Sequence, residues 1–77
     1  MIEIVMRTVR EQFADRLGIG VLSRETRLEE DLNADALDRV ELAMVLEDEL
    51  GLDLDDKTVQ VWRTVGDAVD ACLAQLG

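Results

Sequence analysis

Apolar residues recur at helical spacing through most of this chain, and residues 31–50 carry the most informative pattern. At about 100° per residue, one apolar set falls on a single side of a helix: Leu42, Ala43, Leu46 and Leu50. A second set falls on roughly the opposite side: Leu37, Val40 and Met44. An ordinary surface helix has one apolar stripe and a polar back. The pattern therefore predicts a helix that builds a core with one face and offers the other to a partner.

The expected start of this helix carries capping signals. Asp35 is a suitable N-cap because its carboxylate can accept hydrogen bonds from the amides of the first turn. Asp38, in that first turn, suits both a capping box and the helix dipole. Ala36 is then the first helical residue, at the positive end of the helix, where a phosphate ester is most stabilised. Alanine has no hydroxyl group, so nothing can be esterified at this position.

Helical spacing also predicts a first helix over residues 2–17. Its apolar residues are Ile2, Val5, Met6, Val9, Phe13 and Leu17. Gly18 and Gly20 should end this helix. A long loop over residues 19–34 follows, with too little regular alternation for a pair of strands. We expect its apolar residues to fasten it to the core: Ile19, Val21, Leu22, Leu28 and Leu32.

The chain beyond the central helix predicts two more helices. Gly51 should end the central helix. A short helix over residues 57–62 can be capped by Asp55 or Asp56. Its inward residues are expected to be Val59 and either Val61 or Trp62. Residues 64–67 read Thr-Val-Gly-Asp, which is typical of a capping box that starts the last helix. The apolar stripe of that helix is Val65, Val69, Cys72, Leu73 and Leu76.

Together these elements predict an all-α fold, a small four-helix bundle with a long first loop and a short third helix, in one domain over residues 1–77. Aromatic residues make up 3% of the chain, so the core must be aliphatic. Cys72, the one cysteine, is expected to be a buried and inert thiol. Histidine is absent, which removes the commonest general base and metal ligand. The aspartates of residues 53–56 lack the glycine and final glutamate of an EF-hand, so we expect no metal site.

The charge of the chain is strongly negative and unevenly distributed. The formal net charge is -10, and twelve of the eighteen acidic residues lie within residues 28–56, where Arg39 is the one basic residue. Nucleic acid would be repelled, so we expect a basic protein partner whose attraction weakens with salt. No apolar run is long enough to span a membrane, and the N-terminus lacks the apolar segment of a signal peptide. We therefore expect a soluble, cytoplasmic and monomeric protein.

The stretch around Ala36 resembles a known modification motif. Asp31-Leu32-Asn33-Ala34-Asp35-Ala36-Leu37-Asp38, followed by Val40-Glu41-Leu42, is similar to the motif of acyl carrier proteins. In that family the serine of an Asp-Ser-Leu sequence is esterified by 4'-phosphopantetheine. The resemblance covers essentially the whole chain and is most specific over residues 31–50. Ala36 stands in place of the serine, between Asp35 and Leu37, so the chain as written cannot bear 4'-phosphopantetheine there.

The resemblance implies a carrier and not an enzyme. Its partners would be phosphopantetheinyl transferase and the enzymes of acyl-chain synthesis and transfer. Their basic surfaces would grip one set of residues on the central helix: Leu37, Asp38, Val40, Glu41, Met44, Glu47 and Asp48. The acyl chain would lie between the helices, against Leu46 and Val61. From the residues alone, plainer interpretations stay open: the apolar members of the set could pack beneath the long loop, and the acidic members could form a solvated face.

Ala36 admits two explanations. A serine-to-alanine substitution removes the nucleophilic oxygen and little else, so an engineered change would keep a fatty-acid or polyketide carrier in its unmodified form. Alternatively, the chain is a natural degenerate carrier that acts as a non-catalytic, acidic interaction module. The intact motif around the missing oxygen favours the engineered change. An enzyme is disfavoured, because the chain offers neither a histidine nor a serine at a helix start, and so small a bundle has little room for a cleft with paired carboxylates.

Overall fold

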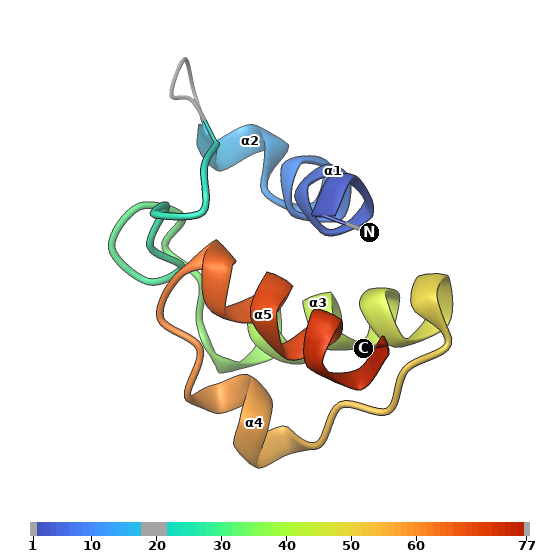
Figure 1. Ribbon diagram of the computed structural model, residues 1–77. Helices are drawn as coiled ribbons and strands as arrows, with labels where there is room; N and C mark the ends of the chain where they lie inside the picture. Colours follow the sequence, from blue (N-terminus) through green and yellow to red (C-terminus); the bar gives the residue numbers. More distant parts are fainter. Residues whose placement is uncertain (1, 18–21, 77) are drawn as a thin grey trace.

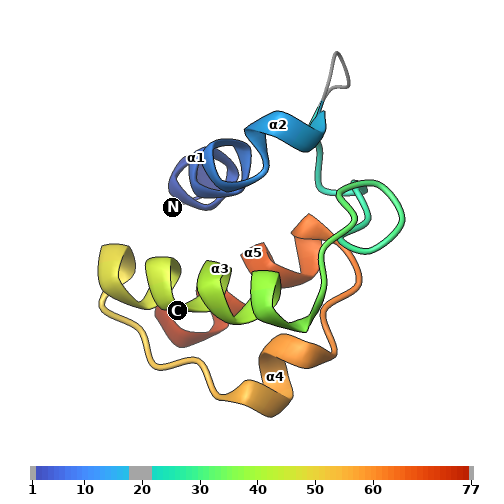
Figure 2. The same cartoon turned by 180° about the vertical axis from the view of Figure 1, so that it is seen from behind.

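One long helix and four shorter ones form the described part of the chain, residues 2–17 and 22–76, in the computed structural model (Figure 1). In chain order they are α1 (Ile2–Gln12), α2 (Ala14–Leu17), α3 (Ala36–Leu50), α4 (Asp56–Gln60) and α5 (Val65–Leu76). The two opposite views show α1 on one side of α3 and α5, and α4 on the other side (Figures 1 and 2). The prediction of a small all-α bundle is confirmed, and α3 has the predicted bounds.

The first predicted helix is divided in two at Phe13, so the prediction of one unbroken helix over residues 2–17 is wrong. Phe13 is a turn residue whose N–H still donates to the carbonyl oxygen of Val9, at an N···O distance of 3.0 Å. The Phe13 ring is buried in the core, so the change of direction coincides with a side chain that packs inward. Several predicted features lie outside the described residues: the helix end at Gly18 and Gly20, and the loop anchors Ile19 and Val21.

Aliphatic side chains from α1, α3, α4 and α5 meet in one core. The predicted inner face of α3 is buried at Leu42, Ala43 and Leu46, and Leu50 is half-buried. Leu28 and Leu32 of the long loop are also buried, which confirms that the loop is fastened to the core. Cys72 lies in the same core, and burial raises the pKa of its thiol. Among the described residues, no helix has the length and the apolar character needed to cross a membrane.

The long loop crosses the start of α5 and is bonded to it. An isolated bridge pairs Arg27 with Thr64. The first amides of α5 donate to loop carbonyls: Val65 N to Thr26 O at 2.9 Å and Gly66 N to Arg24 O at 2.8 Å. A Cβ atom on Gly66 would lie 3.0 Å from the Arg24 carbonyl oxygen, so the close approach favours glycine. These contacts fix the loop against the bundle where its own sequence has no regular structure.

The two C-terminal helices begin at the predicted caps. The side chain of Asp55 accepts from Thr58 N–H at 2.8 Å and caps α4. Thr64 and Asp67 form a reciprocal cap on α5, with N···O distances of 3.1 and 3.2 Å. The stripe of α5 is buried at Val65, Val69 and Cys72. Its last two members, Leu73 and Leu76, are exposed, so the stripe extends past the packed part of the helix.

Val61 faces solvent, so of the two residues predicted as alternatives for the interior, Trp62 is confirmed and Val61 is not. Its side chain is 72% exposed, whereas Val59 and Trp62 are buried. Residues three apart share one face of a helical segment, so Val59 and Trp62 point inward together and Val61 points away. The resemblance implied an acyl-chain contact for Val61, and in this structure Val61 does not line the interior. Leu46, the other implied contact, lies in the core.

Candidate functional site

The start of α3 has the cap that the sequence predicts. Asp35 is extended, with φ -97° and ψ -173°. Its Oδ1 accepts from Asp38 N–H at 2.8 Å, and Asp38 Oδ2 accepts from Asp35 N–H at 3.1 Å. Ala36 follows as the first helical residue and is exposed. The described residues give the amides of Ala36 and Leu37 no hydrogen-bond partner. The positive end of α3 is therefore open at Ala36.

The segment that leads into α3 is held in place by the long loop. The Arg27 N–H donates to Asp31 Oδ2 at 2.7 Å, and the Arg27 guanidinium pairs with the same carboxylate. These two hydrogen bonds lower the pKa of Asp31. Ala34 N–H donates to the Leu28 carbonyl at 2.8 Å. Between these points Asn33 takes a left-handed conformation (φ 53°), which asparagine adopts more readily than most residues. The approach to α3 is thus fixed by contacts on both sides of Asn33.

A surface hollow of about 280 Å³ lies beside residue 36. Its lining residues are Glu29, Ala34, Asp35, Ala36, Arg39 and Gln60. Gln60 of α4 donates its side-chain N–H to the Ala36 carbonyl oxygen at 3.5 Å. Because Ala36 has no hydroxyl, the chain lacks the oxygen that would form a phosphoester. A phosphoester therefore cannot form at position 36 of this chain, although the position is exposed.

Most of the apolar residues predicted on the outward face of α3 are exposed. Leu37 is 64% exposed and Met44 is 61% exposed, while Val40 is half-buried. The alternative in which these residues pack beneath the long loop is therefore wrong for Leu37 and Met44. Glu41 and Asp48 are exposed on the same helix. The structure thus brings large apolar side chains and carboxylates together on the surface of α3.

Glu47 is tied into the connection between α3 and α4. Its Oε2 accepts from Leu54 N–H at 3.1 Å. Its backbone carbonyl accepts from Gly51 and Leu52, which closes the end of α3. Gly51 has the left-handed φ of 66° that such an end requires. The half-buried Glu47 carboxylate therefore has a structural contact that sequence reasoning did not anticipate.

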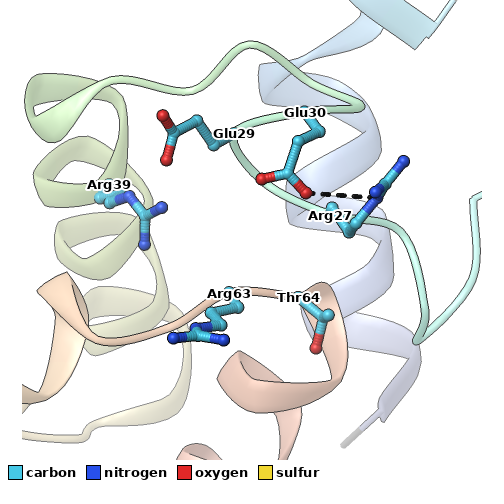
Figure 3. A pocket seen from close by; sticks show the side chains of 6 residues that line it. All are labelled: Arg27, Glu29, Glu30, Arg39, Arg63 and Thr64. Atoms are coloured by element: carbon cyan, nitrogen blue, oxygen red, sulfur yellow. Dashed lines mark ion pairs between the residues drawn. The ribbon is translucent and has the colours of Figure 1, made fainter.

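Arg39 is the residue near the site that sequence reasoning missed. It is 9% exposed, and its guanidinium donates to the carbonyl oxygen of Trp62, which links α3 to the segment between α4 and α5. It lines both the hollow beside Ala36 and a second cavity of about 450 Å³ (Figure 3). Its position one turn after Ala36, as the one base among twelve acids, was a visible signal. Its burial depends on tertiary packing and could not be seen in the sequence.

Comparison with known proteins agrees with this geometry. Residues 7–72 match a family model described as a phosphopantetheine attachment site. The acyl carrier protein of Rubrobacter xylanophilus is 40% identical over 70 residues, which make up 88% of this chain and 86% of that protein. The crystal structure of an acyl carrier protein from Thermotoga maritima matches with a TM-score of 0.78 and 27% identity, over 97% of this chain and 85% of that chain. The chain belongs to the acyl carrier protein family, whose members are carriers and not catalysts.

Proposed function

We propose that this chain is the unmodified form of a carrier for fatty-acid or polyketide synthesis, with alanine substituted for the serine at position 36. In the parent, the serine oxygen would bear 4'-phosphopantetheine, and the thiol of that group would carry the acyl chain as a thioester. One observation carries the proposal: the capped start of α3 is exposed at Ala36, and its first amides have no partner among the described residues. A phosphate ester there would lie at the positive end of α3.

The outward face of α3 is the proposed contact for partner enzymes. Leu37 and Met44 offer apolar area that a partner can bury. Glu41 and Asp48 offer charge to the basic surfaces of the transferase and of the synthesis enzymes. Leu46 would contact the acyl chain inside the bundle. The carrier would work as a cytoplasmic monomer that meets one enzyme at a time.

Loading of a restored serine tests the proposal. The Ala36→Ser variant is incubated with coenzyme A and a broad-specificity phosphopantetheinyl transferase, and the intact mass is measured. We expect the mass to rise by one phosphopantetheine group. The unchanged chain is the matched control, because it retains Ser23 as its one serine and should gain no mass. A folded Ala36→Ser variant that gains no mass would contradict the proposal.

The docking face can be tested in the Ala36→Ser background. Met44→Ala should lower kcat/KM for loading about fivefold, because an exposed apolar contact at an interface is worth about 1 kcal/mol. Leu73→Ala is the matched control, since Leu73 is also exposed but lies on α5. It should leave loading unchanged. Equal effects of both substitutions would argue against α3 as the docking face.

Ala36 itself favours a second candidate function. A natural degenerate carrier would dock to a basic protein through α3 without any prosthetic group. The sequence of the parental gene at codon 36 separates the two candidates. A serine codon supports the engineered form of a working carrier. An alanine codon supports the interaction module, which should then bind its basic partner with an affinity that falls as salt is added.

A further inference from the structure

Arg39 is a nearly buried cation with no carboxylate partner among the described residues. It is 9% exposed, and within the described ranges its guanidinium has one hydrogen-bond acceptor, the neutral carbonyl oxygen of Trp62. A guanidinium has several N–H donors in a fixed fork. Burying a cation is costly unless an anion compensates its charge. The remaining donors of Arg39 are therefore available to an anion from outside the chain.

The cavity that Arg39 lines is unusually basic for this protein. It has a volume of about 450 Å³ and is lined by Arg27, Glu29, Glu30, Arg39, Arg63 and Thr64. Figure 3 shows Arg39 extending from α3, with Arg63 and Thr64 on the segment that enters α5 and the other residues on the long loop. Arg27 is engaged by Glu30, at 3.3 Å, and by Asp31. Arg63 is exposed and has no ion pair among the described residues, although its charge helps to lower the pKa of Asp67.

Arg39 and Arg63 thus line one cavity, and neither has an ion pair among the described residues. An anion in the cavity would be attracted by both positive charges. Planar guanidinium forks match the oxygens of phosphate and carboxylate groups. Glu29 lines the same cavity and has no ion pair among the described residues, so the two arginines must outweigh its charge.

We propose that the cavity between Arg39 and Arg63 is an oxyanion-binding site that takes a phosphate or carboxylate group. The site is formed by residues of this chain as written and does not require a modified residue 36. It lies next to the hollow beside Ala36, with which it shares Glu29 and Arg39.

The test is a titration of the unchanged chain with inorganic phosphate and, separately, with acetate, at constant ionic strength set by sodium chloride. Binding is followed by NMR through the Nε–H signals of the arginine side chains. We expect the Arg39 and Arg63 signals to shift and saturate. Arg63→Gln should weaken binding about tenfold, as expected for loss of a charge-assisted hydrogen bond. Glu29→Gln should strengthen it, because it removes the opposing charge. A preference for phosphate or for acetate identifies the source of the oxyanion.

Arg24→Gln is the matched control. Arg24 pairs with Asp70 at 2.9 Å and does not line this cavity, so its loss should leave binding unchanged. Arg39→Gln removes the charge and also changes the side chain that contacts Trp62. Arg39→Lys keeps the charge, so it should retain more binding than Arg39→Gln. Shifts that follow ionic strength alone, or equal losses in Arg24→Gln and Arg63→Gln, would overturn the proposal. So would a Glu29→Gln variant with unchanged affinity.

Discussion

α3 and α5 each begin with a reciprocal cap, Asp35 with Asp38 in one helix and Thr64 with Asp67 in the other. At α5 the next amides are consumed, because Val65 and Gly66 donate to carbonyls of the long loop. At α3 the corresponding amides have no partner among the described residues. The same local motif thus supports a closed helix start in one place and an open one in the other.

The path of the long loop accounts for the difference between the two helix starts. The long loop covers α5 and then turns away through Asn33 before α3 begins. A helix start whose amides are already bonded cannot offer them to a phosphate. The loop carbonyls of Arg24 and Thr26 are bonded to α5, and among the described residues none is bonded to the first amides of α3.

Asp67 and Asp38, the acidic residues that follow the two N-caps, should contribute unequally to the stability of the protein. Asp67 accepts from both Arg63 N–H, at 2.8 Å, and Thr64 N–H. Asp38 accepts from the N-cap amide of Asp35. We expect Asp67→Ala to lower the free energy of unfolding by about 2 kcal/mol and Asp38→Ala by about 1 kcal/mol. Urea denaturation measures both. Equal losses would mean that the two starts are energetically alike.

One added side-chain heavy atom should be tolerated at the open start and not at the closed one. Gly66→Ala gains helix propensity, but its Cβ would press on the Arg24 carbonyl that Gly66 N–H binds. We expect a net loss of about 1 kcal/mol. Ala36→Ser, where nothing covers the residue, should stay within about 0.5 kcal/mol. Thermal unfolding of both variants checks this, and a stabilised Gly66→Ala protein would show that the loop yields easily.

Low pH should weaken the cap at the start of α5, because Asp67 accepts the capping hydrogen bonds as a carboxylate. Hydrogen bonds from the Arg63 and Thr64 amides lower the pKa of Asp67. A carboxylate whose pKa is lower in the folded state stabilises the protein above its unfolded pKa of about 3.9, and this contribution is lost as pH falls through the folded value. As pH falls below about 4, the free energy of unfolding of Asp67→Asn should therefore decrease less than that of the unchanged chain. Asp48→Asn, an exposed change on α3, is the control. Parallel pH profiles for Asp67→Asn and the unchanged chain would contradict this.

Added salt should have the smallest effect on stability, and this effect should come from the acidic residues in and around α3. Twelve acidic residues lie within residues 28–56, and the net charge of the chain is -10. Self-repulsion at low ionic strength should therefore be relieved by moderate salt or millimolar divalent cation. We expect Tm to rise by a few degrees in either condition. A Tm that responds to neither would mean that crowded carboxylates do not limit stability.

Local sequence determined the caps, the bounds of α3 and its two apolar faces. These features depend on residues three or four apart in the chain, such as Asp35 with Asp38 or Leu42 with Leu46, and such neighbours meet in any helix. The motif around Ala36 likewise lies in one continuous stretch, so its resemblance could be recognised without a structure.

Tertiary structure decided which segments cover which. Only the packed bundle buries Trp62 rather than Val61, divides the first helix at Phe13, and draws the Glu47 carboxylate to Leu54 N–H. It also buries Arg39 against a carbonyl 23 residues away. The contact of Arg39 with Trp62 joins residues that are distant in the chain, and the spacing of residues within one helix does not encode it. The long loop closes α5 and leaves α3 open for the same reason, because both outcomes depend on its path over the assembled core.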